Sequence, residues 1–345
     1  MFKVLKFKNF VITAIVLMIA GIMAVYPSVC VQGAKKGLIL SLFKVFPSVF
    51  PFMVLSRYIT LSGLISVKGR FADKLTKVLF GLPKEALLPF IMGSVSGYPT
   101  GAAVLCDMVD KKILTSDQGE HLLPFCNNCS PLFVIGTVGS VIIGSTSVGY
   151  ILFLIHTTSA IITGMILKSR APYSKCRSEA YVIPQTQNPF TTAVSLSVTS
   201  MLNICGYITL FSVISQVILF VNEDFSLFCG LLEITSGITN IITINIPSSL
   251  KLAVISGFLG FSGLCVLLQT SDFTSVRNMS VRKYFYGKII MGTISFLIAL
   301  AFFTSYESTA VFNPCHQNSH QVFTVFGIIL TLLTVFILFI KNKLE

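Results

Sequence analysis

Glycine, proline and polar residues interrupt four of the apolar stretches in this chain, and the first interruption spans Gly93–Ala102. Glycine and proline stop a continuous helix there, which frees backbone N–H and C=O groups. In lipid such groups must face protein, water or a ligand. Helix N-termini favour anions and freed carbonyls favour cations. The candidate substrate contacts are Ser96, Gly97, Tyr98, Pro99 and Gly101, and a tightly packed loop tip is the alternative.

The second interruption spans Phe125–Phe133 and contains two adjacent amides, Asn127 and Asn128. Each amide offers two donors and an acceptor. Pro131 lacks an N–H and frees a carbonyl about one turn earlier. Together with Ser130, these residues predict a polar, locally unwound midpoint that contacts a substrate or ion. The alternative is that the asparagines only hold neighbouring helices together.

The cysteines of this segment, Cys126 and Cys129, have a spacing found in metal and redox sites. No second cysteine pair or histidine pair accompanies them, so we expect no metal and no cofactor. His156 is a lone histidine in an apolar run, which is more typical of a packed side chain than of a catalytic one. The sequence has no Walker loop, HExxH or GxSxG motif, and we therefore predict that the protein is not an enzyme.

The third interruption, Gly230–Ile238, holds the one acidic residue deep within an apolar stretch, Glu233. A charged side chain at the centre of a spanning helix costs about 2.5–3.5 kcal/mol. We expect Glu233 to bind a proton, a cation or a polar substrate, with Ser236 and Gly237 beside it. The alternative is a structural bond from its carboxylate to backbone N–H groups at a hairpin tip.

The fourth interruption, Gly257–Gly263, mirrors the asparagine segment in the other half of the chain. Ser262 and Gln269 are its polar candidates for substrate contact. The small residues would equally suit close helix packing, so that reading stays open.

The composition shows what must position these segments. Of the 345 residues, 54% are hydrophobic and 11% are charged, against roughly 25% charged residues in soluble domains. A bilayer removes the need for a polar surface, and we predict an all-α polytopic membrane protein. Eight spans are long enough to cross about 30 Å of hydrocarbon: Asn9–Cys30, Leu38–Thr60, His121–Ile143, Val148–Lys168, Thr191–Val221, Leu250–Thr270, Phe285–Ser305 and Val322–Ile340.

The net charge of +12 comes from clusters between the apolar runs, which is typical of cytoplasmic loops rather than of nucleic-acid binding. Only Lys35 and Lys36 fall clearly outside. The clusters share the cytoplasmic side only if Ala86–Val104 and Ser226–Ile246 are re-entrant hairpins. The predicted cytoplasmic residues are Lys3, Lys6 and Lys8; Lys68, Arg70, Lys74, Lys77 and Lys84; Lys111 and Lys112; Lys168, Arg170, Lys175 and Arg177; Arg277, Arg282, Lys283 and Lys288; Lys341 and Lys343.

Each predicted hairpin follows a span and precedes a broken span and an ordinary one, so the halves form an inverted repeat of the kind found in secondary transporters. The apolar run after Lys8 exceeds the about 7–15 residues of a signal-peptide core, which predicts an uncleaved first helix. The expected units are an N-terminal helix (1–37), a first repeat (38–168), a cytoplasmic linker (169–190), a second repeat (191–305), and an extracytoplasmic loop with a last helix (306–345).

At these motifs the sequence resembles the sporulation integral membrane protein YlbJ family, whose members carry nucleoside-recognition Gate-type domains. Two departures are the Cys129-Ser130 pair before Pro131 and the order of small residues in Gly257–Gly263. The resemblance extends from about Phe43 to Gln269, and its residues are Ser96–Pro99, Gly101, Ala102, Glu120, Phe125–Asn127, Pro131–Phe133, Gly136, Gly230–Thr235, Gly237, Gly260–Gly263 and Gln269.

The resemblance implies a spore-forming bacterium, a multi-pass protein of the mother-cell or forespore membrane, and a part in making the spore cortex or coat. With the motifs, it predicts a secondary transporter of a small polar solute or ion, in which Glu233 couples transport to a proton or cation. The partners are the bilayer and this solute, without nucleic acid; a homo-oligomer stays open. A channel is a further option, and a non-transporting scaffold for the spore envelope is the main alternative.

Overall fold

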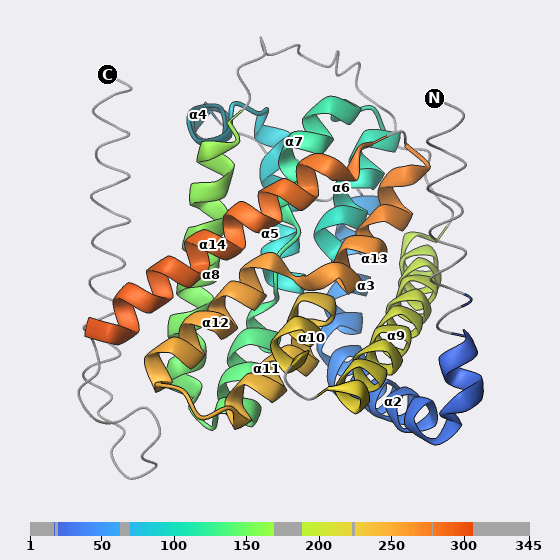
Figure 1. The fold of residues 1–345 in the computed structure, drawn as a ribbon. Coiled ribbons are helices and arrows are strands. Elements are labelled where there is room, and N and C mark those ends of the chain that lie inside the picture. Colours follow the sequence, from blue (N-terminus) through green and yellow to red (C-terminus); the bar gives the residue numbers. More distant parts are fainter. Residues whose placement is uncertain are drawn as a thin grey trace, which may run out of the picture.

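The computed structural model describes residues 17, 20–62, 70–168, 188–222, 225–277 and 279–305, and these contain helices and no strand (Figure 1). This confirms the all-α class. The predicted last span, the loop before it, most of the predicted linker and the basic residues of the N- and C-terminal segments lie outside the described residues. The division into two repeats stays a prediction.

The first long helix is continuous from Pro27 to Ser62. It comprises α2 (Pro27–Leu40), a π-helical turn η1 (Ser41–Val45) and α3 (Phe46–Ser62). The chain leaves helical geometry at Tyr26, before a proline at the first helical position, where a missing N–H costs nothing. The predicted loop between two spans is therefore wrong, because Lys35 and Lys36 lie within α2.

Two glycines near these lysines serve helix packing instead of a turn. A Cβ at Gly33 or Gly37 would lie 2.8 or 2.7 Å from the Cα of Val213 or Thr209 in α9 (Pro189–Val221). The two backbones can approach this closely only because the side chains are absent. Figure 1 shows α2 and α9 side by side at one end of the molecule.

The predicted first interruption separates two packed helices. After α4 (Arg70–Phe80), the turn η2 (Lys84–Ala86) leads into α5 (Leu87–Ser96), which is bent by 81° from α4. The next helix, α6 (Thr100–Asp110), packs back against α5.

The predicted second interruption also lies between two helices. α7 (Ser116–Cys126) ends at the asparagines, and the chain resumes as the π-helix η3 (Leu132–Ile143) before α8 (Thr146–Ile166). The predicted span His121–Ile143 is thus two shorter helices. A capping box at Thr115, closed by Gln118, starts α7, which satisfies the free N–H groups of its first turn.

The second half repeats this order of elements after α9. The short helices α10 (Ser226–Leu232) and α11 (Ile234–Thr243) pack against each other and are separated at Glu233. The broken pair α12 (Ser248–Phe261) and α13 (Gly263–Ser275) follows, and then α14 (Val281–Ser305). All four interruptions predicted from glycine, proline and polar residues are present.

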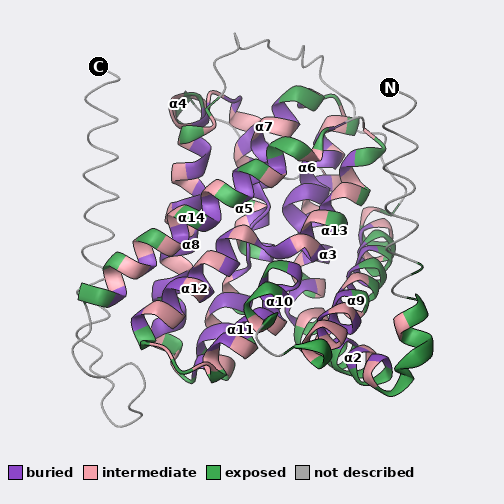
Figure 2. Ribbon diagram, viewed as in Figure 1, coloured by how far each residue is buried: buried purple, intermediate pink, exposed green. Residues whose placement is uncertain are grey.

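Five helices among the described residues are long and apolar enough to cross a membrane, or six if the bent pair α4–α5 counts as one span. This confirms a polytopic membrane protein but not the count of eight. Large apolar side chains stand exposed on the outer helices, such as Val25, Leu202 and Val221, which hydrocarbon contact would cover. Figure 2 shows exposed residues along α2 and buried ones through the central helices.

Basic residues from distant segments meet at one face. Lys168 donates to the backbone oxygen of Val78 in α4 at 2.8 Å, and Lys111 donates to that of Thr60 at the end of α3 at 3.0 Å. Lys168 thus lies beside α4, which carries Arg70, Lys74 and Lys77, whereas one member of the predicted clusters lies elsewhere. Lys288 is 1% exposed inside α14, so its placement in a loop is wrong.

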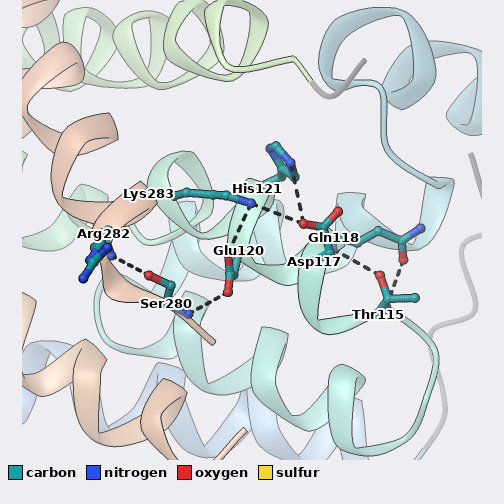
Figure 3. Close-up of polar contacts among 8 residues, drawn as sticks. All are labelled: Thr115, Asp117, Gln118, Glu120, His121, Ser280, Arg282 and Lys283. Carbon is teal, nitrogen blue, oxygen red and sulfur yellow. Dashed lines mark hydrogen bonds and ion pairs between the residues drawn. The ribbon is translucent and has the colours of Figure 1, made fainter. Parts of the chain in front are cut away.

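Ion pairs on this face connect the N-termini of α7 and α14 (Figure 3). The Lys283 ammonium lies 3.2 Å from both Asp117 and Glu120. Glu120 also accepts from the backbone N–H of Ser280 at 2.7 Å. These contacts join elements from the two halves of the chain.

A further ion pair joins α6 to the segment after α13. The Arg277 Nε donates to Asp110 at 2.8 Å. Partial burial, the largest single effect, lowers the pKa of Arg277, but the bond to Asp110 and the nearby charges together outweigh it, and the net shift is upward. The acidic residues Asp107 and Asp110 thus lie in the last turns of α6 rather than in a solvated loop.

Candidate functional site

A cavity lies where three of the predicted interruptions meet α13 and two walls from α3 and α9. Its volume is about 40 Å³, and it is partly open at its mouth. Five of the predicted substrate contacts line it: Gly97, Tyr98, Ser130, Glu233 and Gln269. Gly97 and Gln269, which are 172 positions apart in the sequence, thus share one lining.

The first tip of the cavity is formed by the turn between α5 and α6. Gly97 has φ +83°, and a Cβ there would lie 2.9 Å from the Cβ of Ser130. This conformation and this contact both require glycine. The Tyr98 hydroxyl lies 3.1 Å from the Cys129 Sγ, which donates to it, so the tip is held against the break after α7.

The break after α7 has lost its regular helical hydrogen bonds, and side chains replace them. In a helix the Asn127 carbonyl would accept from residue 131, but Pro131 has no N–H. The Lys288 ammonium donates to this carbonyl at 2.6 Å instead. The Cys129 N–H donates to His156 Nε2 at 3.0 Å, so His156 is a packed, hydrogen-bonded residue as predicted.

Both asparagines of the break are buried and act inside the protein. The Asn127 amide donates to Thr270 in α13 at 3.0 Å and to the Tyr284 hydroxyl in α14 at 3.1 Å. The Asn128 amide donates to the Phe125 carbonyl at 2.7 Å. Neither residue lines the cavity, and this geometry agrees with the structural alternative considered from the sequence. Their side-chain oxygens have no hydrogen-bond partner among the described residues.

The second tip is centred on Glu233, which is 3% exposed. Its two carboxylate oxygens accept from the backbone N–H groups of Thr235 and Ser236 at 2.9 and 2.7 Å. The residue thus caps the N-terminus of α11, where a negative charge is favoured. The structural bond considered from the sequence is present, and Glu233 is also one of the residues that line the cavity.

The second broken helix contributes a kink and an amide. Ser262 separates α12 from α13 with φ +72° and is 1% exposed. Further along α13, the Gln269 amide donates to Cys265 Sγ at 3.2 Å, and both side chains line the cavity.

Nine of the predicted contacts lie outside the cavity lining. They are Ser96, Pro99, Gly101, Asn127, Asn128, Pro131, Ser236, Gly237 and Ser262. Several have a clear packing role. A Cβ at Gly237 would lie 2.0 Å from Gly230 Cα, and one at Gly101 would lie 2.2 Å from the Cys126 carbonyl oxygen. Ser96 shares a 2.6 Å hydrogen bond with Ser56.

Sequence reasoning missed the apolar walls of the cavity. Val49 in α3 and Ile204 and Ile208 in α9 face it. In a long apolar helix nothing distinguishes a side chain that faces a cavity from one that faces lipid. Thr235, two residues after Glu233, also lines the cavity and was not among the predicted contacts.

The burial of two basic residues, Lys288 and Arg57, was also not predicted from the sequence. Lys288 lies three residues into the predicted span Phe285–Ser305, where it reads as the last member of a loop cluster. Arg57 is 4% exposed and donates to Ser200 in α9 at 3.0 Å. A basic residue within an apolar run was the available signal in both cases.

These observations define a multi-pass membrane protein, helical throughout its described residues, with a mainly apolar cavity that a few polar side chains of interrupted helices also line. The chain is 23% identical, over an alignment of 333 residues, to the sporulation integral membrane protein YlbJ of Bacillus subtilis (strain 168). The alignment covers 83% of this chain and 81% of that protein. The resemblance to the YlbJ family is therefore confirmed. No family model matches the chain, and no solved structure matches it.

Proposed function

We propose that the protein is a secondary transporter of a small polar solute or ion. The main support for this proposal is the cavity that Gly97, Ser130 and Glu233 line together. Each of these residues comes from a different break in an apolar helix. Transporters bind substrates at such breaks near the middle of the membrane, where freed backbone groups need partners. In the proposed arrangement, eight spans surround two re-entrant hairpins, α5–α6 and α10–α11.

The order of the elements supports an inverted repeat. A packed helix pair, a broken helix and a long helix follow one another as α5–α6, α7–η3 and α8, and again as α10–α11, α12–α13 and α14. The outer end of the helix pair α5–α6 lies at the face where the basic residues gather, since Lys111, directly after α6, contacts the end of α3. In alternating access, two such units rock around the substrate site.

The lining indicates the kind of solute. The lining includes three residues with groups for hydrogen bonding, Tyr98, Gln269 and Glu233, and apolar side chains that include Ile204 and Ile208. Such a mixture fits a small solute with both polar edges and an apolar face. We assign coupling to Glu233, because a proton or cation that binds its carboxylate competes with the two N–H groups of α11.

The relative suggests the setting. The protein from Bacillus subtilis is described as a sporulation integral membrane protein. By analogy, we propose that this chain is needed to make the spore cortex or coat, and that it lies in the mother-cell or forespore membrane. A deletion strain that forms normal, heat-resistant spores would remove this part of the proposal.

The experiment that tests transport begins by finding the solute. The purified full chain would be heated with a panel of nucleosides, amino acids and organic acids, because a ligand that binds the native state raises its melting temperature. Compounds that stabilise it would then be tested for uptake into proteoliposomes with and without a proton or sodium gradient. Gradient-driven accumulation supports a transporter, and passive equilibration indicates a channel. An absence of both, with normal sporulation of cavity variants, would favour a scaffold.

A further inference from the structure

The side chain of Lys288 is buried in the centre of the helix bundle, on α14. It is 1% exposed, and its ammonium touches the Asn127 carbonyl at 2.6 Å and the Met291 Sδ at 3.6 Å. The ring centre of Tyr284 lies 5.7 Å away. Among the residues that the structure describes, no carboxylate lies within ion-pairing distance of it.

A buried ammonium without a carboxylate is unusual. Removing such a group from water costs several kcal/mol in real proteins, and lysine is almost never fully buried unless it is paired. Inside a membrane protein, a charged residue therefore calls for a functional explanation. Packing alone does not supply one, since a methionine or leucine would fill the same space.

The partner of the ammonium explains its position. The Asn127 carbonyl is free because Pro131 has no N–H to donate to it, and α7 has ended one residue earlier. The freed carbonyls of interrupted helices are the groups that coordinate Na⁺ in many transporters. Here the side-chain cation already stands against that carbonyl.

We propose that the Lys288 ammonium is a built-in monovalent cation for the first helix break, in the place where a mobile alkali-metal ion would otherwise bind. It fixes the Asn127 carbonyl from α14, while the Asn127 amide bonds Thr270 and Tyr284. Lys288 is thus a positioning residue for the segment that carries Ser130 into the cavity. The native state then needs no alkali-metal ion at this break.

This inference concerns the folded protein and does not require that it transports anything. Its test is therefore independent of the proposed function. The purified full chain and a Lys288→Ala variant would be melted in salts of equal ionic strength: sodium chloride, n-propylammonium chloride and N-methyl-D-glucammonium chloride. Propylammonium has the three carbons and the ammonium that the substitution removes. The glucammonium ion is the control, because it is too large for the space that the substitution leaves.

We expect Lys288→Ala to melt about 5 °C below the wild type in the glucammonium salt, because a buried carbonyl is left unpaired. Propylammonium or sodium should recover at least half of this loss. Replacing the glucammonium salt with the propylammonium or sodium salt should not raise the melting temperature of the wild type. It should not raise that of Lys283→Ala either, which is the matched control on the same helix. A Lys288→Ala variant that responds to the three salts as the wild type does would overturn the proposal.

A second variant keeps the test decisive if Lys288→Ala does not fold. Lys288→Met retains the length of the side chain but has no donor and leaves no room for an ion. We expect it to melt below the wild type in all three salts, without recovery. If Lys288→Met is as stable as the wild type, the Asn127 carbonyl does not need a cation and the proposal is wrong.

Discussion

Gly97 lies directly against Ser130, so that a Cβ built on the glycine would be 2.9 Å from the Cβ of the serine. One residue is at the tip between α5 and α6, and the other is in the break after α7. Two segments that lack regular helical hydrogen bonds thus support each other at the wall of the cavity. This contact is where the first half of the site is assembled.

The first prediction follows from this contact. Gly97→Ala should lower the free energy of unfolding by about 2 kcal/mol or more, because φ +83° disfavours a side chain by about 1–2 kcal/mol and the Cβ also meets Ser130. Gly206→Ala in α9 is the matched control, since a Cβ there has nothing within 4 Å. Thermal unfolding in detergent measures both. Equal melting temperatures for the two variants would contradict the role of Gly97.

The second prediction concerns Glu233. In Glu233→Gln one carboxylate oxygen becomes an NH₂ group that faces a backbone N–H of Thr235 or Ser236. We expect a loss of about 1 kcal/mol in stability, as for a weakened helix cap, and the complete loss of coupled uptake. Membrane abundance should stay normal. Glu85→Gln, at the turn before α5, is the control that removes a carboxylate without touching the cavity.

The outcome separates the two roles of this residue. A Glu233→Gln variant that is less stable but retains gradient-driven uptake or normal sporulation would show that the carboxylate is only a cap. Wild-type stability with lost uptake would instead assign it entirely to coupling.

Much of the site was predictable because broken helices leave strong local signals. Glycine, proline and paired amides placed the breaks at Gly97, Asn127 and Glu233 within a residue or two. Two interpretations of the asparagines were open from the sequence, and the structure places Asn127 and Asn128 in internal bonds rather than in the cavity. Which option holds depends on contacts between distant segments, and local pattern does not contain them.

The misplaced parts have equally physical reasons. The stretch with Lys35 and Lys36 was predicted to lie between two spans, but its glycines, Gly33 and Gly37, are contact points for α9. Glycine suits both a turn and close helix packing. Lys288 reads as the end of a basic cluster, because the carbonyl that holds it belongs to a segment 161 residues away. The apolar walls at Ile204 and Ile208 had no signal, since lipid and cavity select the same side chains.

The third prediction tests the arrangement in the membrane. Ser116 at the start of α7 and Ser248 at the start of α12 are both exposed. We expect Ser116→Cys to react with a membrane-impermeant maleimide only from the cytoplasm and Ser248→Cys only from outside. The seven described native cysteines are buried, and the unmodified chain measures the background. Labelling of both variants from the same side would rule out two opposed hairpins.

The fourth prediction concerns the ion pairs between α7 and α14. Lys283 is 43% exposed and bridges Asp117 and Glu120, so we expect Lys283→Ala to cost only about 0.5 kcal/mol because solvent screens the pairs. The loss should shrink further in high salt. Melting curves at low and high salt measure this. A cost that is unchanged by salt would mean that Lys283 stabilises the protein through packing.

The last prediction uses the apolar wall of the cavity. Ile204 lines it, whereas Leu202 on the same helix is 66% exposed on the outer surface. Ile204→Trp should fill the cavity and abolish uptake and ligand-induced stabilisation, while Leu202→Trp, which adds the same bulk toward lipid, should leave both intact. The native chain has no tryptophan, so each variant carries a single fluorophore. Quenching by a stabilising solute in Leu202→Trp, or normal uptake by Ile204→Trp, would place the substrate elsewhere.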